Sequence, residues 1–324
     1  MLSAYHDQLI NIRRQLHQNP EEGWSEFTTT AFLVTTLRGY GYDVLTGRKV
    51  VAPEACLGRE ESVVKAGLER ARRNGVSEAL LSEMEELTGC VAVLDTGRPG
   101  PTLAIRFDID CVPVTECTDD THVPAKEGFI SKNPGFMHAC GHDAHMSMGL
   151  AVAHWVMDNK DKLSGKIKIL FQPAEEGVRG AAGMAASGIL DDCDYFLGSH
   201  VAMSANRVKL PPISMAICAP PSLTSPSTAS PLMPALPQEG RNALTAAANA
   251  TVQMMGISRH SGGMTRINIG QLIAGEGRNV IPSKAVMKLE VRGETGEINQ
   301  YMVDQVTNIC KGIAMSFGVT YEMR

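Results

Sequence analysis

Short apolar runs of strand length alternate with helical patterns over the first two thirds of the chain, and this alternation limits the fold most. Residues 91–94, 102–107 and 166–171 are apolar or β-branched runs of strand length. Between the last two, residues 146–157 read MSMGLAVAHWVM, which predicts a buried helix. Strands that alternate with helices predict an α/β sheet with helices on its faces. In such sheets, ligand sites gather at the carboxyl ends of the strands.

A second pattern follows in the last third of the chain. Its predicted elements, in chain order, are a helix at 242–255, strands at 266–273 and 285–291, a helix at 298–315 and the start of a strand at 319–323. This order lacks only a leading strand to complete a ferredoxin-like unit. Because one core rarely exceeds roughly 250 to 300 residues, we predict two domains, 1–206 and 207–324.

The leading strand should lie near residues 212–230, where the composition changes. Residues 211–237 hold 8 of the 17 prolines and no charged residue. Because proline cannot donate a hydrogen bond to a sheet, we expect no central strand and an irregular loop over most of this segment. A flexible Pro/Ser/Thr linker is the alternative interpretation.

Composition excludes several classes of protein. The 30 Lys and Arg against 35 Asp and Glu give a net charge of -5, so a nucleic-acid partner is not expected. The chain has no apolar run of 18 residues, which predicts no membrane span, and its polar start lacks the pattern of a signal peptide. The eight cysteines form no CxxC pair, which suits a reducing compartment. We therefore expect a cytoplasmic protein.

The densest chemical signal is HACGHDAH at residues 138–145. Thiolate and imidazole are the ligands that borderline-soft divalent metals prefer, and Gly141 relaxes the backbone between Cys140 and His142. An isolated histidine or cysteine is usually a packing or surface residue. The cluster nevertheless predicts a metal site.

A second signal, FQPAEEG at residues 171–177, directly follows an apolar strand. Paired glutamates at a strand end suit a division of labour in which Glu176 ligates a metal and Glu175 takes a proton from water. The alternative is a solvated surface pair. His200 follows another apolar run, residues 195–199, and alone it would more often be a packed histidine.

Together these segments resemble the amidohydrolase branch of the aminoacylase and glutamate carboxypeptidase family of metallopeptidases. The matching motifs are RRxLHxxPExG (13–23), RFDIDCVPVTE (106–116), HACGHDAH, FQPAEEG, His200 and GEGRNVIP (275–282). The Glu- and Arg-rich insertion at residues 60–87 is similar to that of members that hydrolyse p-aminobenzoyl-glutamate. The resemblance implies a mixed-sheet α/β catalytic domain with an inserted ferredoxin-like (α+β) lid, which also serves dimerisation.

The resemblance also implies the roles of the site residues. Cys140, His142, Glu176 and His200 would ligate two divalent metal ions, Mn or Zn. Glu175 would be the catalytic general base. The substrate would be a small acyl-amino acid or dipeptide-like molecule, with p-aminobenzoyl-glutamate favoured and split into p-aminobenzoate and glutamate.

Four further residues and the partners follow from the same resemblance. Asp108 and Asp110 would hold the ligand histidines in place from behind the metal site, although ordinary strand-end carboxylates are the alternative. Asn279 and Arg292 would bind the carboxylate of the substrate, and Arg292 as a surface residue is the alternative. The resemblance further implies a dimer through the lid and a second type of subunit.

The sequence departs from the family pattern in two places. It stops at Arg324, where relatives return to the catalytic domain and add a last metal-binding histidine, and residues 211–237 replace the first lid strand with its His-Ala-Gly motif. A compensated frameshift between about Arg207 and Gln238 is our hypothesis for the second departure. We therefore expect a truncated, frameshifted and inactive hydrolase. The alternatives are an aminoacylase or hippurate hydrolase type of enzyme, a non-catalytic metal-binding fragment, and a module that senses the substrate.

Overall fold

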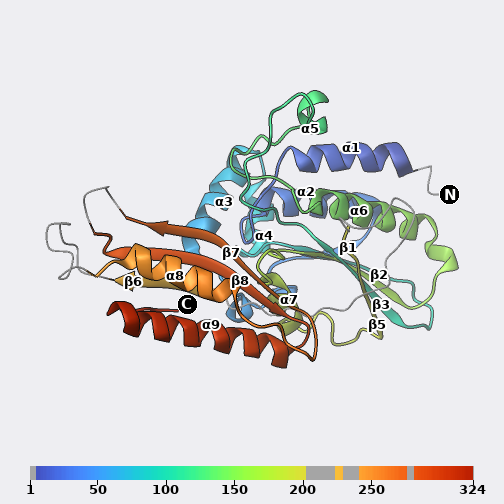
Figure 1. Ribbon diagram of the computed structural model, residues 1–324. Helices are drawn as coiled ribbons and strands as arrows, with labels where there is room; N and C mark the ends of the chain where they lie inside the picture. The colour runs from blue at the N-terminus through green and yellow to red at the C-terminus, as the bar shows by residue number, and fades with distance from the viewer. Residues whose placement is uncertain (1–4, 202–222, 229–240, 276–280, 324) are drawn as a thin grey trace. The chain divides into compact units, whose positions relative to one another are not determined.

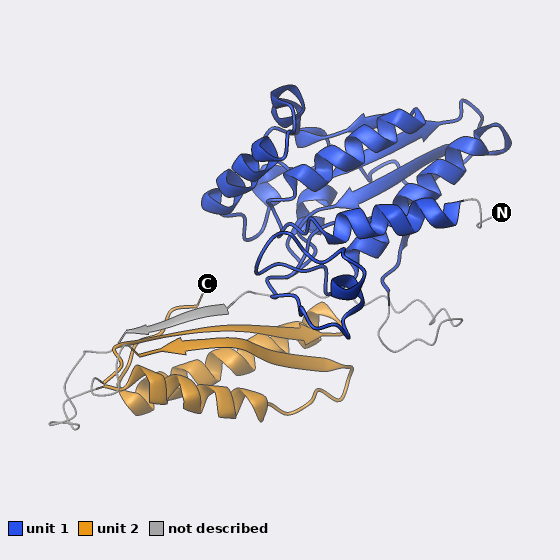
Figure 2. Ribbon diagram, turned by 90° about the horizontal axis from the view of Figure 1, so that it is seen from above, with its two compact units in different colours: residues 1–211 blue, residues 212–324 orange. Residues whose placement is uncertain are grey.

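The computed structural model describes residues 5–201, 223–228, 241–275 and 281–323 of the chain (Figure 1). The chain divides into two compact units, residues 1–211 and 212–324 (Figure 2). The expected domain boundary after residue 206 falls outside the described residues and stays a prediction.

The first unit is built on a five-stranded mixed sheet. Its strands are β1 (Asp43–Leu45), β2 (Cys90–Asp95), β3 (Thr102–Asp108), β4 (Lys166–Gln172) and β5 (Tyr195–Gly198). Their order is β1-β2-β4-β3-β5, with β3 parallel to both β4 and β5 and the other pairs antiparallel. The predicted α/β class with a mixed sheet is confirmed.

Parallel pairing brings three strand ends to one edge of this sheet. Asp108 lies opposite Gln172 at the ends of β3 and β4, and Arg106 lies opposite Gly198 at the end of β5. The segments that follow these strands carry Asp110, the Glu175–Glu176 pair and His200. Residues far apart in the sequence therefore meet at this edge.

Helices cover both faces of the sheet (Figure 1). The helices of this unit are α1 (His6–His17), α2 (Phe27–Tyr40), α3 (Glu61–Arg73), α4 (Glu78–Met84), α5 (Val123–Lys126), α6 (His142–Asp158) and α7 (Gly180–Ala186), with short 3-10 turns at Gly47–Lys49, Pro53–Ala55 and Lys160–Lys162. Of these, α5 lies on a loop away from the sheet (Figure 1). Strand β4 shows why two layers form. Ile169 and Phe171 pack into one hydrophobic cluster with α1, α2 and α6, while Leu170 packs into another with α3, α4 and α7.

The second unit has the order strand, helix, strand, strand, helix. Its elements are β6 (Leu223–Thr228), α8 (Ala243–Met255), β7 (Thr265–Ala274), β8 (Lys284–Gly293) and α9 (Gly296–Phe317). The strands form an antiparallel sheet in the order β6-β8-β7. Residues of α8, α9 and β8 share one hydrophobic core, which includes Met254, Val291 and Val306.

Strand β6 corrects the expectation for the Pro-rich segment. It pairs with β8 along its whole length, and Pro226 lies opposite Val286. The strand is at the edge of the sheet, where one side of the backbone needs no partner, so proline is tolerated there. The expectation of an irregular loop is therefore wrong for residues 223–228. The rest of residues 211–237 lies outside the described residues.

The expected strand at residues 319–323 is not present. These residues have no regular secondary structure and pair with no strand among the described residues. Val319, Tyr321 and Met323 still pack into the core of the second unit. Their apolar alternation therefore reflects side-chain packing rather than a sheet ladder.

None of the helices in the described part of the chain has both the length and the apolar character that a membrane span needs.

Candidate metal centre

The predicted ligands come from a helix start, a strand-end turn and a strand end. Cys140 and His142 flank Gly141, whose φ of 86° is in the left-handed region, and α6 begins at His142. Glycine adopts this φ at little cost, so the thiol and the imidazole can approach the same point. Glu176 lies in the turn after β4, and His200 follows β5.

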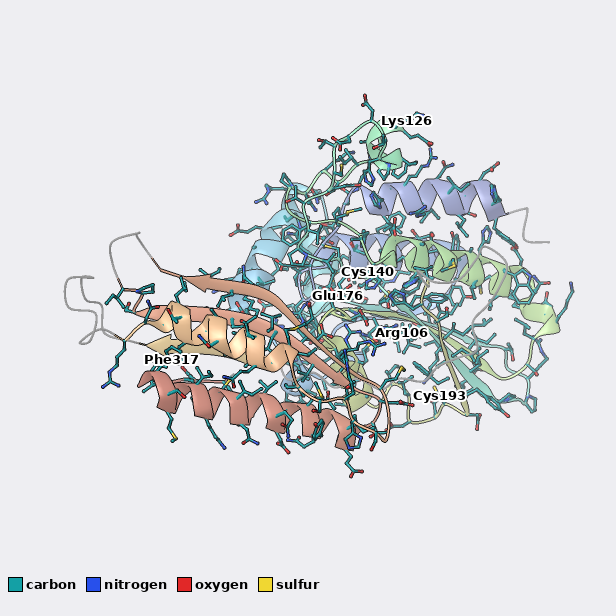
Figure 3. The ribbon with its side chains drawn as sticks, in the orientation of Figure 1. Arg106, Lys126, Cys140, Glu176, Cys193 and Phe317 are labelled. Carbon is teal, nitrogen blue, oxygen red and sulfur yellow. The ribbon has the colours of Figure 1, made fainter. Side chains whose placement is uncertain are left out.

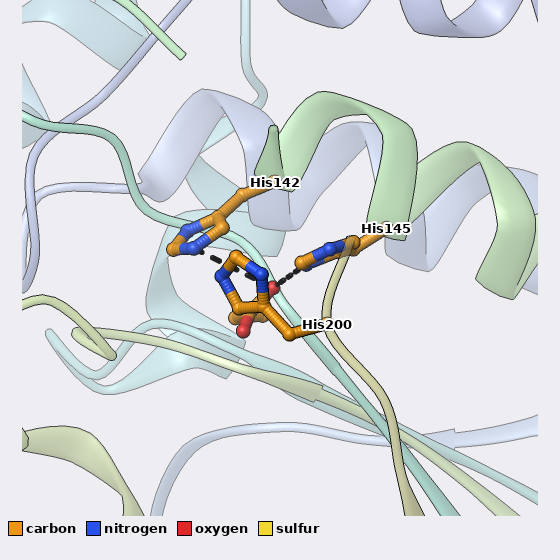
Figure 4. Close-up of side chains that lie close together, drawn as sticks. His142, His145 and His200 are labelled. Atoms are coloured by element: carbon orange, nitrogen blue, oxygen red, sulfur yellow. Dashed lines mark hydrogen bonds and ion pairs between the residues drawn. The ribbon is translucent and has the colours of Figure 1, made fainter. Parts of the chain in front are cut away.

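These side chains form two overlapping groups of donor atoms. In each group the donor atoms all lie within 4.8 Å of one another. One group is Cys140, His142 and Glu176, and Figure 3 labels Cys140 and Glu176 close together. The other is Asp108, His142, His145 and His200, whose three rings gather at one point in Figure 4. The structure therefore brings all four predicted ligands together, with His142 common to both groups.

His142 presents a bare ring nitrogen to the cluster. Its Nδ1 donates to the backbone oxygen of Asp110 at 2.8 Å, so in the neutral ring Nε2 carries the lone pair. That Nε2 lies 3.8 Å from a carboxylate oxygen of each of Asp108, Glu175 and Glu176. These distances are too long for hydrogen bonds.

Several buried polar atoms here have no hydrogen-bond partner among the residues that the structure describes. They include Nε2 of His142, Oε1 of Glu176 and Oδ1 of Asp110. Buried polar atoms are almost always satisfied, so a group of orphans at one point needs an explanation. Imidazole, thiolate and carboxylate are the donors that zinc takes. The residues therefore fit a divalent cation.

The electrostatics of the cluster favour a cation as well. Burial lowers the pKa of His142, but the carboxylates of Asp110, Asp108 and Glu176 outweigh it and raise the pKa to about 9. Burial, and then Glu176, raise the pKa of the Cys140 thiol to about 12. A cation held by these residues would favour the thiolate form of Cys140 and the neutral form of His142, because metal ligands bind in their deprotonated forms.

Glu175 lies beside the cluster without belonging to either group. Its Oε2 is 3.8 Å from Nε2 of His142. Burial, and then the charge of Glu176, raise the pKa of Glu175. A carboxylate with a raised pKa is a better proton acceptor near neutral pH, which is what a general base requires.

Asp108 and Asp110 contact residues of both donor groups. Asp108 is fully buried between Nδ1 of His145 and the guanidinium of Arg106, whose Nη1 is 2.8 Å away. Burial would raise the pKa of Asp108, but His145 and Arg106 outweigh it and hold the pKa far below its usual range. Asp110 accepts the backbone N–H of Glu176 at 2.9 Å, besides its bond with His142.

His145 is the residue that sequence reasoning left without a role. Its Nδ1 contacts Asp108, and its Nε2 accepts the backbone N–H of Val201 at 2.9 Å. Both ring nitrogens are thus used, and the bond to Val201 holds the strand end that carries His200. The spacing of His142 and His145, three residues apart on a helix, was the signal, since such residues share one face.

The two residues expected at the substrate carboxylate belong to the second unit, residues 212–324. Arg292 is on β8 in the second unit, where its guanidinium pairs with Glu290. Asn279 lies outside the described residues. The roles of both residues toward a substrate stay predictions.

Known proteins resemble this chain over most of its length. The model of peptidase family M20/M25/M40 matches residues 104–318. A homolog of one subunit of p-aminobenzoyl-glutamate hydrolase, from Haemophilus influenzae, is 51% identical, over 98% of this chain and 75% of that protein. The indole-3-acetyl-aspartic acid hydrolase of Enterobacter agglomerans is 41% identical, over 100% of this chain and 76% of that protein.

A solved structure extends the likeness to the fold. The aminobenzoyl-glutamate utilization protein from Klebsiella pneumoniae has a TM-score of 0.79 and 36% sequence identity with this chain. The match covers 100% of this chain and 76% of that one. With a family match over most of the chain and a relative at 51% identity, the chain belongs to peptidase family M20/M25/M40.

Proposed function

We propose that the cluster is the metal centre of an amidohydrolase that cleaves p-aminobenzoyl-glutamate into p-aminobenzoate and glutamate. The observation that carries the proposal is the bare Nε2 of His142, with Cys140 and Glu176 in one group of donor atoms and Glu175 beside it. A buried set of orphaned donors next to a carboxylate with a raised pKa suits hydrolysis.

Cys140, His142, Glu176 and His200 would hold two divalent cations, Zn²⁺ or Mn²⁺. Thiolate and imidazole favour zinc, and the carboxylates also suit manganese. When bound, the cations supply positive charge that polarises the amide carbonyl and makes water more acidic. Asp108 and Asp110 act on the donors, because such outer partners fix the orientation of ligand side chains.

Glu175 would move the proton. As a carboxylate, it takes a proton from water while the water oxygen bonds to the carbonyl carbon. It then delivers that proton to the amide nitrogen as the C–N bond breaks, so that the amino acid leaves as an amine. Its raised pKa suits it to both steps, since the same group must accept a proton and return it.

The names of the relatives support the substrate class. Both curated relatives are named as hydrolases of an aromatic acyl group joined to an acidic amino acid. Arg292 and Asn279 remain the residues proposed to bind the carboxylate of the substrate, a group that arginine can bind in a bidentate way. The Haemophilus influenzae relative is named for one subunit of its hydrolase, which supports a second type of subunit here. We also propose dimerisation through the second unit and a cytoplasmic location.

The test is release of p-aminobenzoate from p-aminobenzoyl-glutamate by the full chain with added Zn²⁺ or Mn²⁺. We expect Glu175→Gln to lower the rate by about 10²- to 10⁴-fold while the chain still binds Zn²⁺, because only the proton carrier is lost. Glu54→Gln, an exposed change of the same kind, is the matched control.

The other outcomes separate the alternatives. Preferred cleavage of hippurate or N-acetyl amino acids would favour the aminoacylase type. Bound Zn²⁺ without release of p-aminobenzoate would match the expectation of an inactive chain. Undiminished release by Glu175→Gln would show that the assignment of the base is wrong.

A further inference from the structure

Glu26 is a fully buried acid that the proposed mechanism does not use. It lies three residues after the RRxLHxxPExG motif, at the start of α2, and is 0% exposed. Its side chain makes no helix cap. A buried carboxyl is costly unless its oxygens find partners, so its contacts indicate what it does.

Those contacts reach the turn that carries the paired glutamates. Oε1 of Glu26 accepts the backbone N–H of Ala174 at 2.8 Å, and the hydroxyl of Thr88 bonds Oε2 at 2.7 Å. Ala174 directly precedes Glu175. Glu26 therefore holds the peptide from which the proposed base and its neighbouring ligand extend.

The held peptide is strained. Ala174 has a φ of 48°, in the left-handed region that residues with a Cβ rarely adopt. Its carbonyl accepts the N–H groups of Gly180 at 2.8 Å and Arg179 at 3.2 Å, so the turn closes around this one residue. A strained residue persists only where its surroundings fix it.

The segment before Glu26 packs closely against the same turn. A Cβ at Gly23 would lie 2.9 Å from Cα of Ala174 and 2.5 Å from Nη2 of Arg179. Only glycine lets the two backbones approach this closely. Gly23, the last residue of the motif, thus contacts the same residue, Ala174, as Glu26 does.

We propose that Glu26 is a positioning residue that fixes the left-handed Ala174 peptide and so directs Glu175 and Glu176 into the cluster. This role rests on the proposed function of those two glutamates. It is not a catalytic role, because Glu26 acts only through the backbone of the turn.

The length and protonation of the Glu26 side chain predict which substitutions keep its bond to Ala174. Burial, and then the nearby Asp110, raise the pKa of Glu26 to about 8, so the acid is mostly protonated at pH 7. Glutamine has the same length, keeps an oxygen for Ala174 and offers an N–H to Thr88. Aspartate is one methylene shorter and withdraws its oxygen from Ala174.

The test compares Glu26→Gln, Glu26→Asp and Glu26→Ala in the full chain. We expect Glu26→Gln to keep Zn²⁺ affinity and kcat within about threefold of the unsubstituted chain. Glu26→Asp and Glu26→Ala should lose roughly 10- to 100-fold in both, as is typical when support for a metal ligand is removed. KM should change little, since no contact with substrate is altered. Adding Ala174→Gly to Glu26→Ala should restore part of the loss, because glycine adopts the left-handed peptide without strain.

Hydrogen–deuterium exchange of a peptide covering residues 171–180 reports on the turn without cations or turnover. Exchange should be faster in Glu26→Asp and Glu26→Ala but not in Glu26→Gln. Thr88→Val is the control, since it removes the other partner of Glu26 and should lower the melting temperature without faster exchange in the turn.

Two results would overturn the role. One is unchanged exchange at residues 171–180 in both shortened variants. The other is a lower melting temperature with unchanged Zn²⁺ affinity and kcat, which would make Glu26 a structural residue only. Failure of the unsubstituted chain to bind Zn²⁺ or to turn over would count against the proposed function, while exchange would still decide the positioning role.

Discussion

His17, in the first sequence motif, is a buried histidine held between two buried carboxylates. Its Nδ1 lies 2.9 Å from Asp143 and its Nε2 lies 2.8 Å from Glu116. A ring nitrogen can donate to a carboxylate only if it carries a proton, so this geometry suits a His17 protonated on both nitrogens, the form present below its pKa. His17 thereby ties α1 to α6 and to the loop that precedes the cluster.

The charge of His17 predicts how stability depends on pH. Burial lowers its pKa, but bonds to Asp143 and Glu116 outweigh it and raise the pKa above 6.5. Its contribution is therefore complete below pH 6.5 and is lost as the pH rises through the raised pKa. Burial raises the pKa values of Asp143 and Glu116, but their bonds to His17 and further contacts, such as that of Glu116 with the backbone N–H of Ser131, outweigh it. The contributions of both carboxylates are therefore lost as the pH falls below about 4.

We predict that His17→Gln lowers the free energy of unfolding most near pH 5.5, by about 3–5 kcal/mol, the usual cost of breaking a buried ion pair. The loss should shrink as the pH rises above the raised pKa of His17. Thermal unfolding at pH 5.5 and pH 9 measures it, and His6→Gln, at an exposed position, is the control with a change under about 0.5 kcal/mol. An equal loss at both pH values would contradict a protonated His17.

Helix α6 carries two of the cluster histidines, and a glycine lets it lie close to the sheet. A Cβ at Gly149 would lie 2.8 Å from ring atoms of Phe107 and Phe171. At Gly39, in α2 of the same unit, no atom of the described residues lies within 4 Å of such a Cβ. Substituting alanine at both positions compares the cost of crowding at Gly149 with the gain in helix propensity at Gly39.

We predict opposite effects of the same substitution at these positions. Gly39→Ala should stabilise the chain by about 0.5–1 kcal/mol, because alanine favours a helix. Gly149→Ala should destabilise it, since overpacking costs about 1–3 kcal/mol and outweighs that gain. Urea unfolding of both variants gives the comparison. If Gly149→Ala proved as stabilising as Gly39→Ala, α6 could not lie against Phe107 and Phe171 as described.

The same helix shows where sequence periodicity fails. Strands β2, β3 and β4 begin and end within one residue of their predicted bounds, because apolar runs of strand length are a strong signal. Helix α6, expected from residue 146, begins at His142. Its first turn is polar but buried at the site, so it has no apolar period, and the shared helical face of His142 and His145 was missed.

In the molecule as a whole, each unit has a hydrophobic core of its own, and the catalytic chemistry is proposed for the first. The motifs indicated which residues could bind metal, because those residue types cluster in the sequence. They could not indicate the bonds from Asp108 to His145 or from His145 to Val201. Such contacts depend on β3 lying between β4 and β5, an order that no local pattern encodes.

The central claim is that Cys140, His142, Glu176 and His200 form a divalent metal centre. Isothermal titration of the purified, metal-free chain with Zn²⁺ tests it most directly, with Cys140→Ser beside the control Cys117→Ser, an exposed cysteine. The account predicts that Zn²⁺ binds with release of protons and that Cys140→Ser weakens this binding by at least about 10-fold. It predicts no change in Cys117→Ser. Equal binding by all three chains, or none by the unsubstituted chain, would contradict it.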